Sequence, residues 1–548
     1  MVRRTAVPSL VVIIMMLGVV SGAYGQGEVA APDEKGVPPN RDYLALLPFE
    51  VIDTASNNLI LRFTDLVLPG NAGRSVRIER VFSNSTFGVG WRMGIAGVPM
   101  RVVEPPTRWL TESDFNVPWD LQQERRRTPA FQTLEGGAIR TTYWAQPTIE
   151  QASQYLVRGS DFGQYNRATR ILLQPDGTRA TYCAATELGC PGEGYLKELS
   201  DPFGNTVTLA WEATGSEGTT GYVTARLASL TQDLGNGQTR EVTFGAGPDP
   251  WMPGSMTYLG RTWQYGFVDG ELRTVTPPLG PGWTFEYWTN ADPALSDGKV
   301  KMVTTPQGGT VQYRFDNRTY PVITPAFVYG TPAPFNVLVE RKTNDGVQGE
   351  QRWTFEPLGL ETSPFTQVVR PDGTELLYFY EPADPNAVLE GAWRLEHMEV
   401  RANGITVEAD KREYDYLQAA RTPASNALWG LSQPIRRTIT RMGTTHKTEY
   451  AYGSVGAHFH NYHHPTTITE RGPDGTVRRT TTRTYTHLAA MPSTPYLLGL
   501  PASEAVTEAG RRRARPGLTT SPPDFGRRRP LTGLRQPLPP TPGATSPR

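Results

Sequence analysis

The sequence predicts an all-β protein made of stacked short antiparallel hairpins that form a β-solenoid or shell-like strip. The first observation is an 18-residue unit that occurs three times without a gap, at residues 194–211, 270–287 and 298–315. The second is that apolar residues occupy every second position in the later part of each unit, as in a half-buried strand. Because one hairpin cannot bury its apolar face alone, repeated hairpins indicate an array of mutually covering units.

A predicted turn divides each unit into two strands. A proline stands two residues before a glycine in all three copies: Pro202 and Gly204, Pro278 and Gly280, Pro306 and Gly308. Proline fixes φ, and glycine accepts the positive φ that many tight reversals need. These six residues are therefore the predicted repeat turns.

The composition is the third observation that favours a β-protein. The 548 residues include 55 Gly and 48 Pro, while aromatic residues make up 10%. Disordered chains are poor in aromatic residues, so this composition indicates many short strands joined by tight turns. No stretch after the N-terminus has the 3.6-residue period of a long helix.

The charge distribution argues against a nucleic-acid-binding surface. The net charge is zero overall, but residues 1–25 carry +2 and residues 509–548 carry +8, which leaves −10 on residues 26–508. A mildly acidic body is the opposite of the basic footprint that phosphate recognition requires.

Residues 1–25 have the pattern of a secretory signal peptide. Arg3 and Arg4 precede a short apolar core at 10–20, and Ala23 and Gly25 occupy the small-residue positions before a cut. The alternative is an uncleaved membrane anchor, but the apolar run is shorter than the roughly 20 residues that a spanning helix needs. We expect cleavage after Gly25, a linker at 26–42, and a secreted, periplasmic or cell-surface protein with no integral membrane span.

Residues 43–100 carry several short motifs in register. The matching positions are Asn58, Leu59, Thr64, Asp65, Leu66, Leu68, Pro69, Gly70, Arg80, Phe82, Phe87, Gly88, Gly90 and Trp91. This series resembles the N-terminal segment of bacterial RHS/YD-repeat proteins, whose pattern is roughly N-L-x4-T-D-L-x-L-P-G, R-x-Y/F-x-S and F-G-x-G-W. The resemblance is looser in the middle of the chain and extends over residues ~50 to ~508.

Degenerate YD-type β-repeats are predicted over residues 101–508, with an irregular insertion at about 101–160. Pro-Asp-Gly-Thr occurs at 175–178, 371–374 and 473–476, each time before an alternating strand. Tyr414 and Asp415 are the nearest approach to the family's Tyr-Asp pair, and a full Y-D-x-x-G-R repeat is missing. The Arg/Pro-rich residues 509–548 are expected to be disordered, and their abrupt start is typical of a frameshift or truncation.

Cys183 and Cys190 are the only cysteines. In an exported protein two nearby cysteines are expected to form a disulfide that closes a loop. A metal site is the weaker alternative, because the chain has neither a C-x-x-C pair nor a companion pair.

A histidine-rich segment contains His458, His460, His463 and His464. His458 and His460 would share one face of a strand, a spacing that can hold Zn²⁺ with a third ligand. We interpret the segment instead as a solvated, aromatic-rich loop, so no metal or other cofactor is expected.

No catalytic motif stands out, and a non-enzymatic protein is expected. Neither G-x-S-x-G nor H-E-x-x-H occurs, and there is no phosphate-binding loop. Paired acids for glycoside hydrolysis are possible in any chain of this length, but exposed acids explain them more simply. Trp263, Trp283 and Trp288 could stack on sugar rings, although alternating positions favour packing on a sheet.

The family resemblance implies a structural role. RHS proteins carry their activity in a variable C-terminal domain, released by Asp-dependent self-cleavage in a core domain, and this chain shows neither part. No catalytic residue is therefore carried over. We expect an exported, non-catalytic shell protein of a toxin-encapsulating or cell-contact system, with an effector domain encoded downstream as a partner. The alternative is a surface adhesin or carbohydrate-binding β-repeat protein with cell-surface glycans as partners.

Overall fold

The structure, a computed structural model, describes most of the chain between residues 42 and 515. The described ranges are 42–70, 74–85, 88–103, 130–134, 140–141, 143–144, 156–158, 163–185, 187–217, 222–235, 237–289, 298–319, 334–347, 349–360, 363–382, 393–415, 433–455, 458–459, 464–488, 497–508 and 511–515. The expected signal peptide at 1–25 and most of the tail lie outside these ranges. Within them there is no helix that could cross a membrane.

Five antiparallel strands near the N-terminus form a separate sheet, here called the inner sheet. Its strands pair in chain order and are β1 (Tyr43–Leu47), β2 (Glu50–Asp53), β3 (Asn58–Pro69), β4 (Ser75–Ser85) and β5 (Gly88–Ile95). A small sheet follows, with strands β6 (Arg101–Val103), β7 (Ala130–Gln132) and β8 (Arg140–Thr141).

Most remaining strands form one long antiparallel sheet, here called the curved sheet, in which each strand pairs with its neighbours in chain order. Its strands are β9 (Tyr143–Trp144), β10 (Leu156–Arg158), β11 (Gln164–Asn166), β12 (Ile171–Leu173), β13 (Arg179–Tyr182), β14 (Leu196–Ser200), β15 (Thr206–Glu217), β16 (Tyr222–Gly235), β17 (Gln238–Gly245), β18 (Ser255–Tyr258), β19 (Arg261–Val268), β20 (Glu271–Thr276), β21 (Trp283–Tyr287), β22 (Val300–Thr304), β23 (Thr310–Thr319), β24 (Pro334–Asn344), β25 (Glu350–Leu360), β26 (Ser363–Val369), β27 (Glu375–Pro382), β28 (Trp393–Ala402), β29 (Ile405–Asp415), β30 (Gln433–Arg441), β31 (Thr444–Ala451), β34 (Thr467–Arg471), β35 (Val477–Leu488), β36 (Leu497–Glu508) and β37 (Arg511–Arg515). The hairpin of β32 (Ser454–Val455) and β33 (His458–Phe459) lies between β31 and β34.

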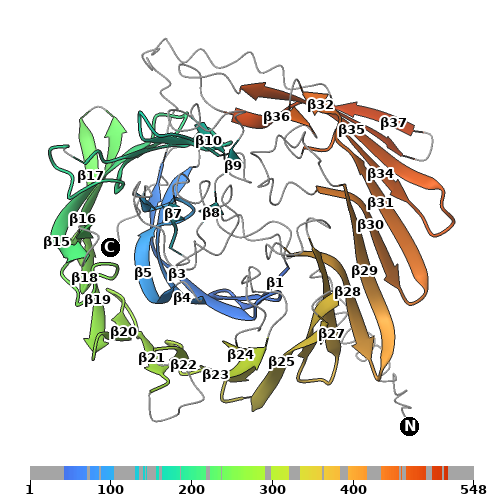
Figure 1. Ribbon diagram of the computed structural model, residues 1–548, viewed down its shortest axis with the longest axis horizontal. Coiled ribbons are helices and arrows are strands. Elements are labelled where there is room, and N and C mark those ends of the chain that lie inside the picture. Colours follow the sequence, from blue (N-terminus) through green and yellow to red (C-terminus); the bar gives the residue numbers. More distant parts are fainter. Residues whose placement is uncertain are drawn as a thin grey trace, which may run out of the picture.

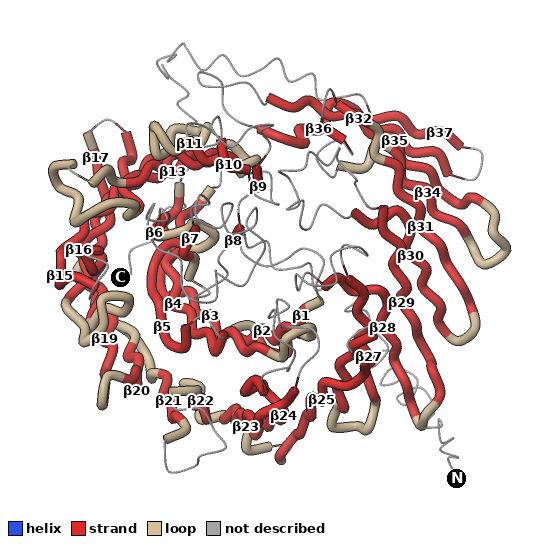
Figure 2. Tube along the Cα trace, viewed as in Figure 1, coloured by secondary structure: helices blue, strands red, loops and turns tan. Residues whose placement is uncertain are grey.

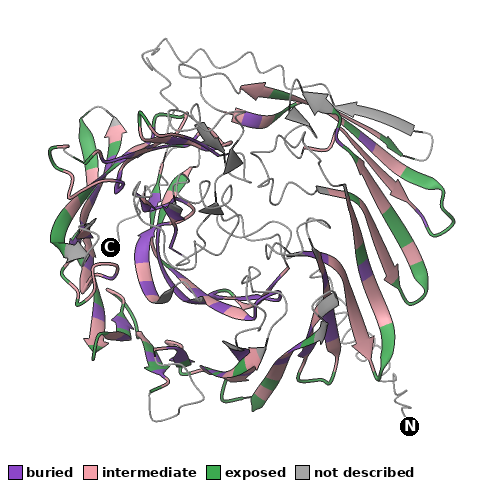
Figure 3. Ribbon diagram, viewed as in Figure 1, coloured by how far each residue is buried: buried purple, intermediate pink, exposed green. Residues whose placement is uncertain are grey.

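The curved sheet bends around the inner sheet. Figure 1 shows β1 to β5 inside the arc that β15 to β29 describe, and Figure 2 shows the absence of helices in the described chain. The buried side chains concentrate where the two sheets face each other (Figure 3). The prediction of an all-β protein of antiparallel hairpins is thus confirmed at that level.

The three 18-residue units are three hairpins of the curved sheet: β14–β15, β20–β21 and β22–β23. Their strands pair at equivalent positions, with Leu199 opposite Val207, Val275 opposite Trp283, and Val303 opposite Val311. The turn glycines have positive φ, at 81° for Gly204, 83° for Gly280 and 88° for Gly308. The repeated sequence therefore corresponds to a repeated register. The units join edge to edge through ladder hydrogen bonds within one sheet.

A short part of the Arg/Pro-rich tail forms a strand. β37 pairs with β36 from Glu504↔Arg515 to Glu508↔Arg511, whereas residues 516–548 lie outside the described residues. Strand pairing needs backbone N–H and C=O groups and does not require an apolar side chain, so an Arg-rich segment can add to an exposed sheet edge.

The ends of the strands in the curved sheet form two rims, which we call its two edges, and the connections at these two edges differ in length. Strand direction alternates, so alternate connections lie at the same edge. One edge, here the short-turn edge, has connections such as 201–205, 259–260, 305–309, 403–404 and 442–443. The opposite edge has longer connections, among them 320–333, 383–392 and 416–432. The long connections are therefore confined to one edge, which also has the short connections 269–270 and 361–362, whereas the short-turn edge has only short ones between β14 and β37.

Candidate functional site: the interface between the inner and curved sheets

A buried arginine of the inner sheet lies among aromatic rings from both sheets. The Arg80 guanidinium carbon is 4.1 Å from the Phe63 ring centroid, 5.5 Å from that of Trp91 and 5.7 Å from that of Phe285 on β21. Trp91 and Phe285 also meet edge to face, with 4.9 Å between their centroids. Cation–π contacts gain strength when water is excluded, and Arg80 is only 1% exposed.

Asp65 neutralises this buried arginine. Arg80 Nε donates to both carboxylate oxygens, at 3.1 and 2.9 Å, and the Tyr265 hydroxyl on β19 donates to Oδ2 at 3.0 Å. A bulge between Thr64 and Leu66 takes Asp65 out of the regular ladder with β4. Burial raises the pKa of Asp65, and the positive charge of Arg80 opposes that rise. The bulge thus places a carboxylate between the two sheets.

Trp91 makes a second polar contact with the curved sheet. Its indole Nε1 donates to the Tyr287 hydroxyl at 2.7 Å, and that hydroxyl donates to the Leu272 carbonyl at 2.6 Å. Burial raises the pKa of Tyr287, so the phenol stays protonated at neutral pH. Trp91 is therefore connected by hydrogen bonds to two strands of the repeat region, β21 directly and β20 through Tyr287.

A second buried ion pair lies further along the interface. Arg341 Nε on β24 donates to the Glu50 oxygens at 2.6 and 2.9 Å, and both side chains are 3% exposed or less. Burial raises the pKa of Glu50, and Arg341 opposes the rise. Tyr313 of the third repeat unit lies beside this pair. Burial raises the pKa of Tyr313, and the negative charge of Glu50 raises it further.

Backbone and hydroxyl contacts extend the interface on both sides of these pairs. Leu338 N donates to the Asn57 carbonyl at 3.2 Å, and Met93 N donates to the Trp251 carbonyl at 2.9 Å. The Thr54 and Tyr380 hydroxyls are 2.5 Å apart. The inner sheet is therefore bonded to strands from β17–β18 to β27.

The turn after β3 is held by the curved sheet. The Pro69 carbonyl accepts hydrogen bonds from Gln232 Nε2 at 3.1 Å and from Arg240 Nη1 at 2.9 Å. A Cβ atom on Gly70 would lie 2.3 Å from the Arg74 carbonyl oxygen and 2.8 Å from Asn205 Oδ1. Glycine is therefore required at this position by close packing against a repeat turn.

Two of the hollows that border the interface lie beside turns of the curved sheet. One, of about 230 Å³, lies beside Arg74, Asp176, Asn205 and Gln232. The other, of about 740 Å³, is lined by side chains of the inner sheet together with Trp283, Thr305 and Gln307. Residues of the short turns line both hollows: Asn205 lines the first, and Thr305 and Gln307 line the second.

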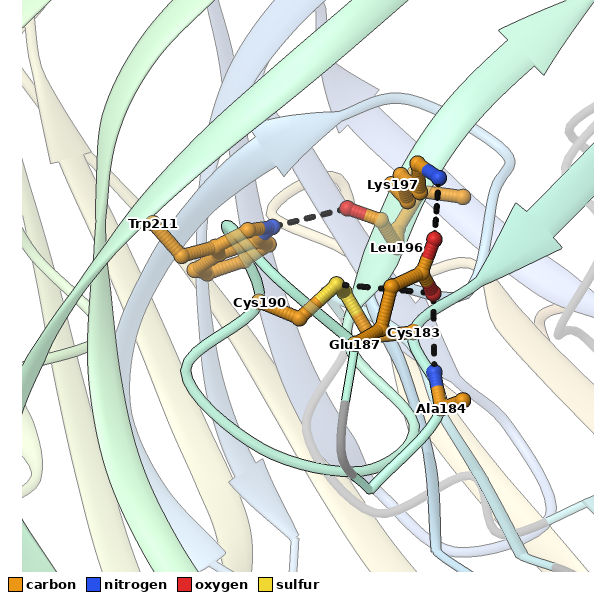
Figure 4. Close-up of a disulfide and its surroundings, with 7 residues drawn as sticks. All are labelled: Cys183, Ala184, Glu187, Cys190, Leu196, Lys197 and Trp211. Atoms are coloured by element: carbon orange, nitrogen blue, oxygen red, sulfur yellow. Dashed lines mark hydrogen bonds and ion pairs between the residues drawn. A yellow bond between two sulfur atoms is a disulfide. The ribbon is translucent and has the colours of Figure 1, made fainter.

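Cys183 and Cys190 are joined by a disulfide, as the sequence predicts. Figure 4 shows Glu187 inside the closed loop, where it accepts from Ala184 N at 3.1 Å and pairs with Lys197. The hydrogen bond from Lys197, followed by that from Ala184, lowers the pKa of Glu187. The loop is thus closed by one covalent bond and reinforced by one ion pair.

The disulfide loop leads directly into a contact with the small sheet. Val102 N donates to the Gly194 carbonyl at 2.8 Å, and a Cβ atom on Gly194 would lie 1.8 Å from the Val102 oxygen. The ring of Tyr195 lies under Arg101, with the guanidinium carbon 4.8 Å from its centroid. The loop therefore fixes the chain where β6 meets the curved sheet.

We predict that replacing both cysteines by serine will lower the free energy of unfolding by about 2–3 kcal/mol, because the unfolded chain regains the freedom of the closed loop. Urea unfolding of the C183S/C190S variant measures this loss, and the wild-type protein unfolded with a reducing agent is the matched control. Equal urea midpoints for the oxidised wild type and the variant would contradict a stabilising role.

The structure places the other sequence-predicted residues as follows. Asp65, Arg80 and Trp91 come together in one cluster, and Pro69 and Gly70 lie at a separate turn. Thr64 Oγ1 donates to Glu79 at 3.1 Å, whereas Asn58, Leu66 and Gly90 take part in the strand ladders. The repeat turns lie at the short-turn edge.

Alternation in the third repeat unit predicts that Tyr313 lies on the packed face of its strand, and Tyr313 is buried. Other interface residues were not predicted: Glu50, Arg341 and Tyr265 lie within strands, where no sequence signal marks a charged or phenolic side chain as part of an interface. Trp263, Trp283 and Trp288 are partly buried and pack against the core. This placement favours packing over sugar stacking for these three side chains.

The histidines do not form a metal site in the described part of the chain. No group of three or more His, Cys, Asp or Glu side chains is close enough there to hold a metal ion. The side chains of His458, His460 and His463 lie outside the described residues. His464 is described: it lies in the connection before β34, and its ring lies near that of His487.

Comparison with known proteins shows similarity to a number of solved structures, among them the following three. No protein-family model and no curated protein matches the chain. A Tc holotoxin pore structure from Photorhabdus luminescens matches 83% of this chain and 22% of its own, at 9% identity and a TM-score of 0.26. A porin-like protein from Bacteroides uniformis covers 58% of this chain and 92% of its own, at 11% identity and a TM-score of 0.16. The N-terminal domain of effector protein SpvB from Salmonella typhimurium covers 56% and 97%, at 13% identity and a TM-score of 0.16. This chain thus spans about a fifth of the length of the holotoxin chain.

Proposed function

We propose that this chain is the non-catalytic wall of an exported protein shell of the RHS/YD-repeat type. The observation that carries the proposal is that the curved sheet already surrounds a separately paired sheet of its own chain (Figure 1). The buried ion pair of Glu50 with Arg341, together with the hydroxyl contacts of Tyr265 and Tyr287, joins the inner sheet to the curved sheet in that position. A sheet that encloses one folded segment through its concave face is suited to enclose another polypeptide.

The chemistry of the interface supports a structural role over a catalytic one. Asp65 and Glu50 are each bonded to an arginine. Glu50 pairs with Arg341 across the two sheets, whereas Asp65 pairs with Arg80 inside the inner sheet and reaches the curved sheet through the Tyr265 hydroxyl. Perturbed acids can also mark catalytic sites, but both carboxylates here are fully engaged in packing. The proposed partner is an effector polypeptide that occupies the remaining concave space.

A fusion experiment tests the shell. A small reporter enzyme with a protease-sensitive linker is attached downstream of β37, and the same reporter is attached upstream of β1 as the matched control. We expect the downstream reporter to be cut at least tenfold more slowly than the upstream one. Equal cleavage rates in a folded protein would overturn the proposal, and binding on a glycan array would then favour the adhesin.

A further inference from the structure

The beginning of β36 touches a turn from the opposite end of the curved sheet. Leu498 N donates to the Pro175 carbonyl at 2.8 Å, and Leu497 forms an isolated antiparallel bridge with Asp176. A Cβ atom on Gly177 would lie 2.8 Å from Leu497 Cδ2. A strand near the end of the curved sheet is thereby attached to the turn between β12 and β13. We call this contact the closing contact.

The Asp176 side of the closing contact is also tied to the inner sheet. Arg74 Nη1 donates to Asp176 Oδ2 at 3.2 Å, and Arg74 Nη2 donates to the Asp176 carbonyl at 3.3 Å. Three segments that are remote in sequence therefore meet at one point: the turn before β4, the turn before β13 and the start of β36. Loss of the Leu497–Leu498 contact would separate the last strands from the other two segments.

Two histidines hold the chain immediately after the closing contact. Gly499 N donates to His487 Nδ1 at 3.1 Å. The His464 ring packs directly on Gly499, since a Cβ atom there would lie 2.1 Å from His464 Nε2. Gly499 also has a φ of 72°, so a side chain is disfavoured here by both space and backbone conformation.

The hydrogen bond from Gly499 requires a neutral His487. A neutral imidazole accepts through its unprotonated nitrogen, whereas both nitrogens of a protonated imidazole are donors. Protonation of His487 at Nδ1 would therefore bring its N–H group into repulsive contact with the N–H group of Gly499, and the hydrogen bond would be lost. The His464 and His487 ring centroids are 5.9 Å apart, so protonation of both rings would also add a repulsion between two cations.

Tyrosine, arginine and acidic side chains surround His464 and His487. Tyr485 on β35 lies 5.1 Å from the His464 centroid and 6.3 Å from that of His487, and its hydroxyl donates to the Pro465 carbonyl. The ion pair of Arg483 with Glu504 joins β35 to β36 further along, and Arg74 with Asp176 lies across the closing contact. Burial lowers the pKa of both histidines, and for His464 the neighbouring His487 lowers it further.

The direction of the pH effect follows from these shifts. A histidine whose folded pKa lies below its unfolded value of 6.5 stabilises the fold fully above that value. Its contribution is lost as the pH falls through the folded pKa. The contact of β36 with the turn before β13 is therefore strongest at neutral and alkaline pH.

We propose that His464 and His487 form an acid-sensitive device that holds the start of β36 in the closing contact. When both are neutral, Gly499 is bonded to His487 and Leu498 is positioned against Pro175. When they are protonated, residues 497–499 leave this position and the last strands detach from the turn before β13. The device would open the end of the curved sheet without unfolding the inner sheet, and it operates whether or not a second polypeptide is enclosed.

Hydrogen exchange followed by mass spectrometry tests this device in the full chain. After correction for intrinsic exchange, we expect the amides of residues 497–500 to lose at least tenfold protection between pH 7.5 and pH 5.5. Residues 271–276 of β20 serve as the internal control and should keep their protection. An unchanged protection of residues 497–500, or an equal loss in β20, would overturn the proposal.

Variants assign the effect to the two histidines. The double variant H464F/H487N retains a ring and an acceptor without a titrating imidazole, so we expect it to lose the pH step. H446N, which changes a histidine on β31, is the matched control and should retain the step. Persistence of the step in a folded H464F/H487N protein would overturn the assignment. If that variant does not fold, the pH at which residues 497–500 of the wild-type protein lose half of their protection tests the assignment. A midpoint above pH 6.5 would overturn it, because the pKa values of both histidines are lowered.

Discussion

Replacing Arg80 by methionine is expected to lower the free energy of unfolding by about 3–5 kcal/mol, the cost of leaving a buried charge without its partner. The variant keeps an apolar side chain of similar length among Phe63, Trp91 and Phe285, so packing changes little. Asp65 would then remain between the sheets with only the Tyr265 hydroxyl as a described partner. Urea unfolding followed by tryptophan fluorescence measures the loss, because Trp91 lies in the same cluster.

The double variant D65L/R80M is the matched control for this prediction. Replacement of both members of a buried pair by apolar residues is often neutral or stabilising, so we expect most of the lost free energy to return. An R80M variant with the wild-type urea midpoint would show that the ion pair does not stabilise the protein. A double variant no better than R80M would assign the loss to packing.

Replacing Tyr313 by aspartate is expected to destabilise the protein by several kcal/mol, because it buries a second carboxylate beside Glu50. Tyr313 is 1% exposed, and its strand β23 pairs with the strand that carries Arg341. Two neighbouring acids cannot both ionise cheaply in a buried site, and one arginine cannot neutralise both. The loss should be measured by thermal and urea unfolding.

The pH dependence of the Tyr313→Asp variant provides its internal check. The folded pKa of Glu50 is raised, so the stability that it contributes is present below its unfolded pKa and is lost as the pH rises through the folded value. A second acid at position 313 should strengthen this trend, so the variant should be weaker at pH 8 than at pH 5. Tyr313→Phe keeps the ring and should change the free energy of unfolding by about 1 kcal/mol or less. A Tyr313→Asp protein as stable as the wild type would contradict the burial of this unit.

The local parts of the fold could be predicted from the sequence. Alternation at residues 283–287 and 311–315 and the Pro-x-Gly turns are short-range patterns, and they specify hairpins whatever surrounds them. These local patterns do not specify how the sheet curves. A shell-like strip was expected from the repeats, but the position of the inner sheet inside the curve was not. That position relies on pairs such as Glu50 with Arg341, which are 291 residues apart. No local pattern records such a pairing.

The candidate site was predicted in part for the same reason. The family-like motif contained Asp65, Arg80 and Trp91, but their partners Tyr265 and Tyr287 lie on strands that the sequence marks only as alternating. His464 was grouped with its sequence neighbours, whereas in three dimensions it lies beside His487. In both cases the sequence does not specify which distant strand packs against the residue.

The unequal edges of the curved sheet have a consequence for how such a chain can change over generations. An insertion in 320–333 or 416–432 lengthens a connection and leaves the pairing of the flanking strands as it was. An insertion at Gly443 would instead disturb a two-residue reversal between β30 and β31, and with it the faces of the strands that follow. The short turns thus fix the register of the paired strands, whereas the long connections can accept additional residues.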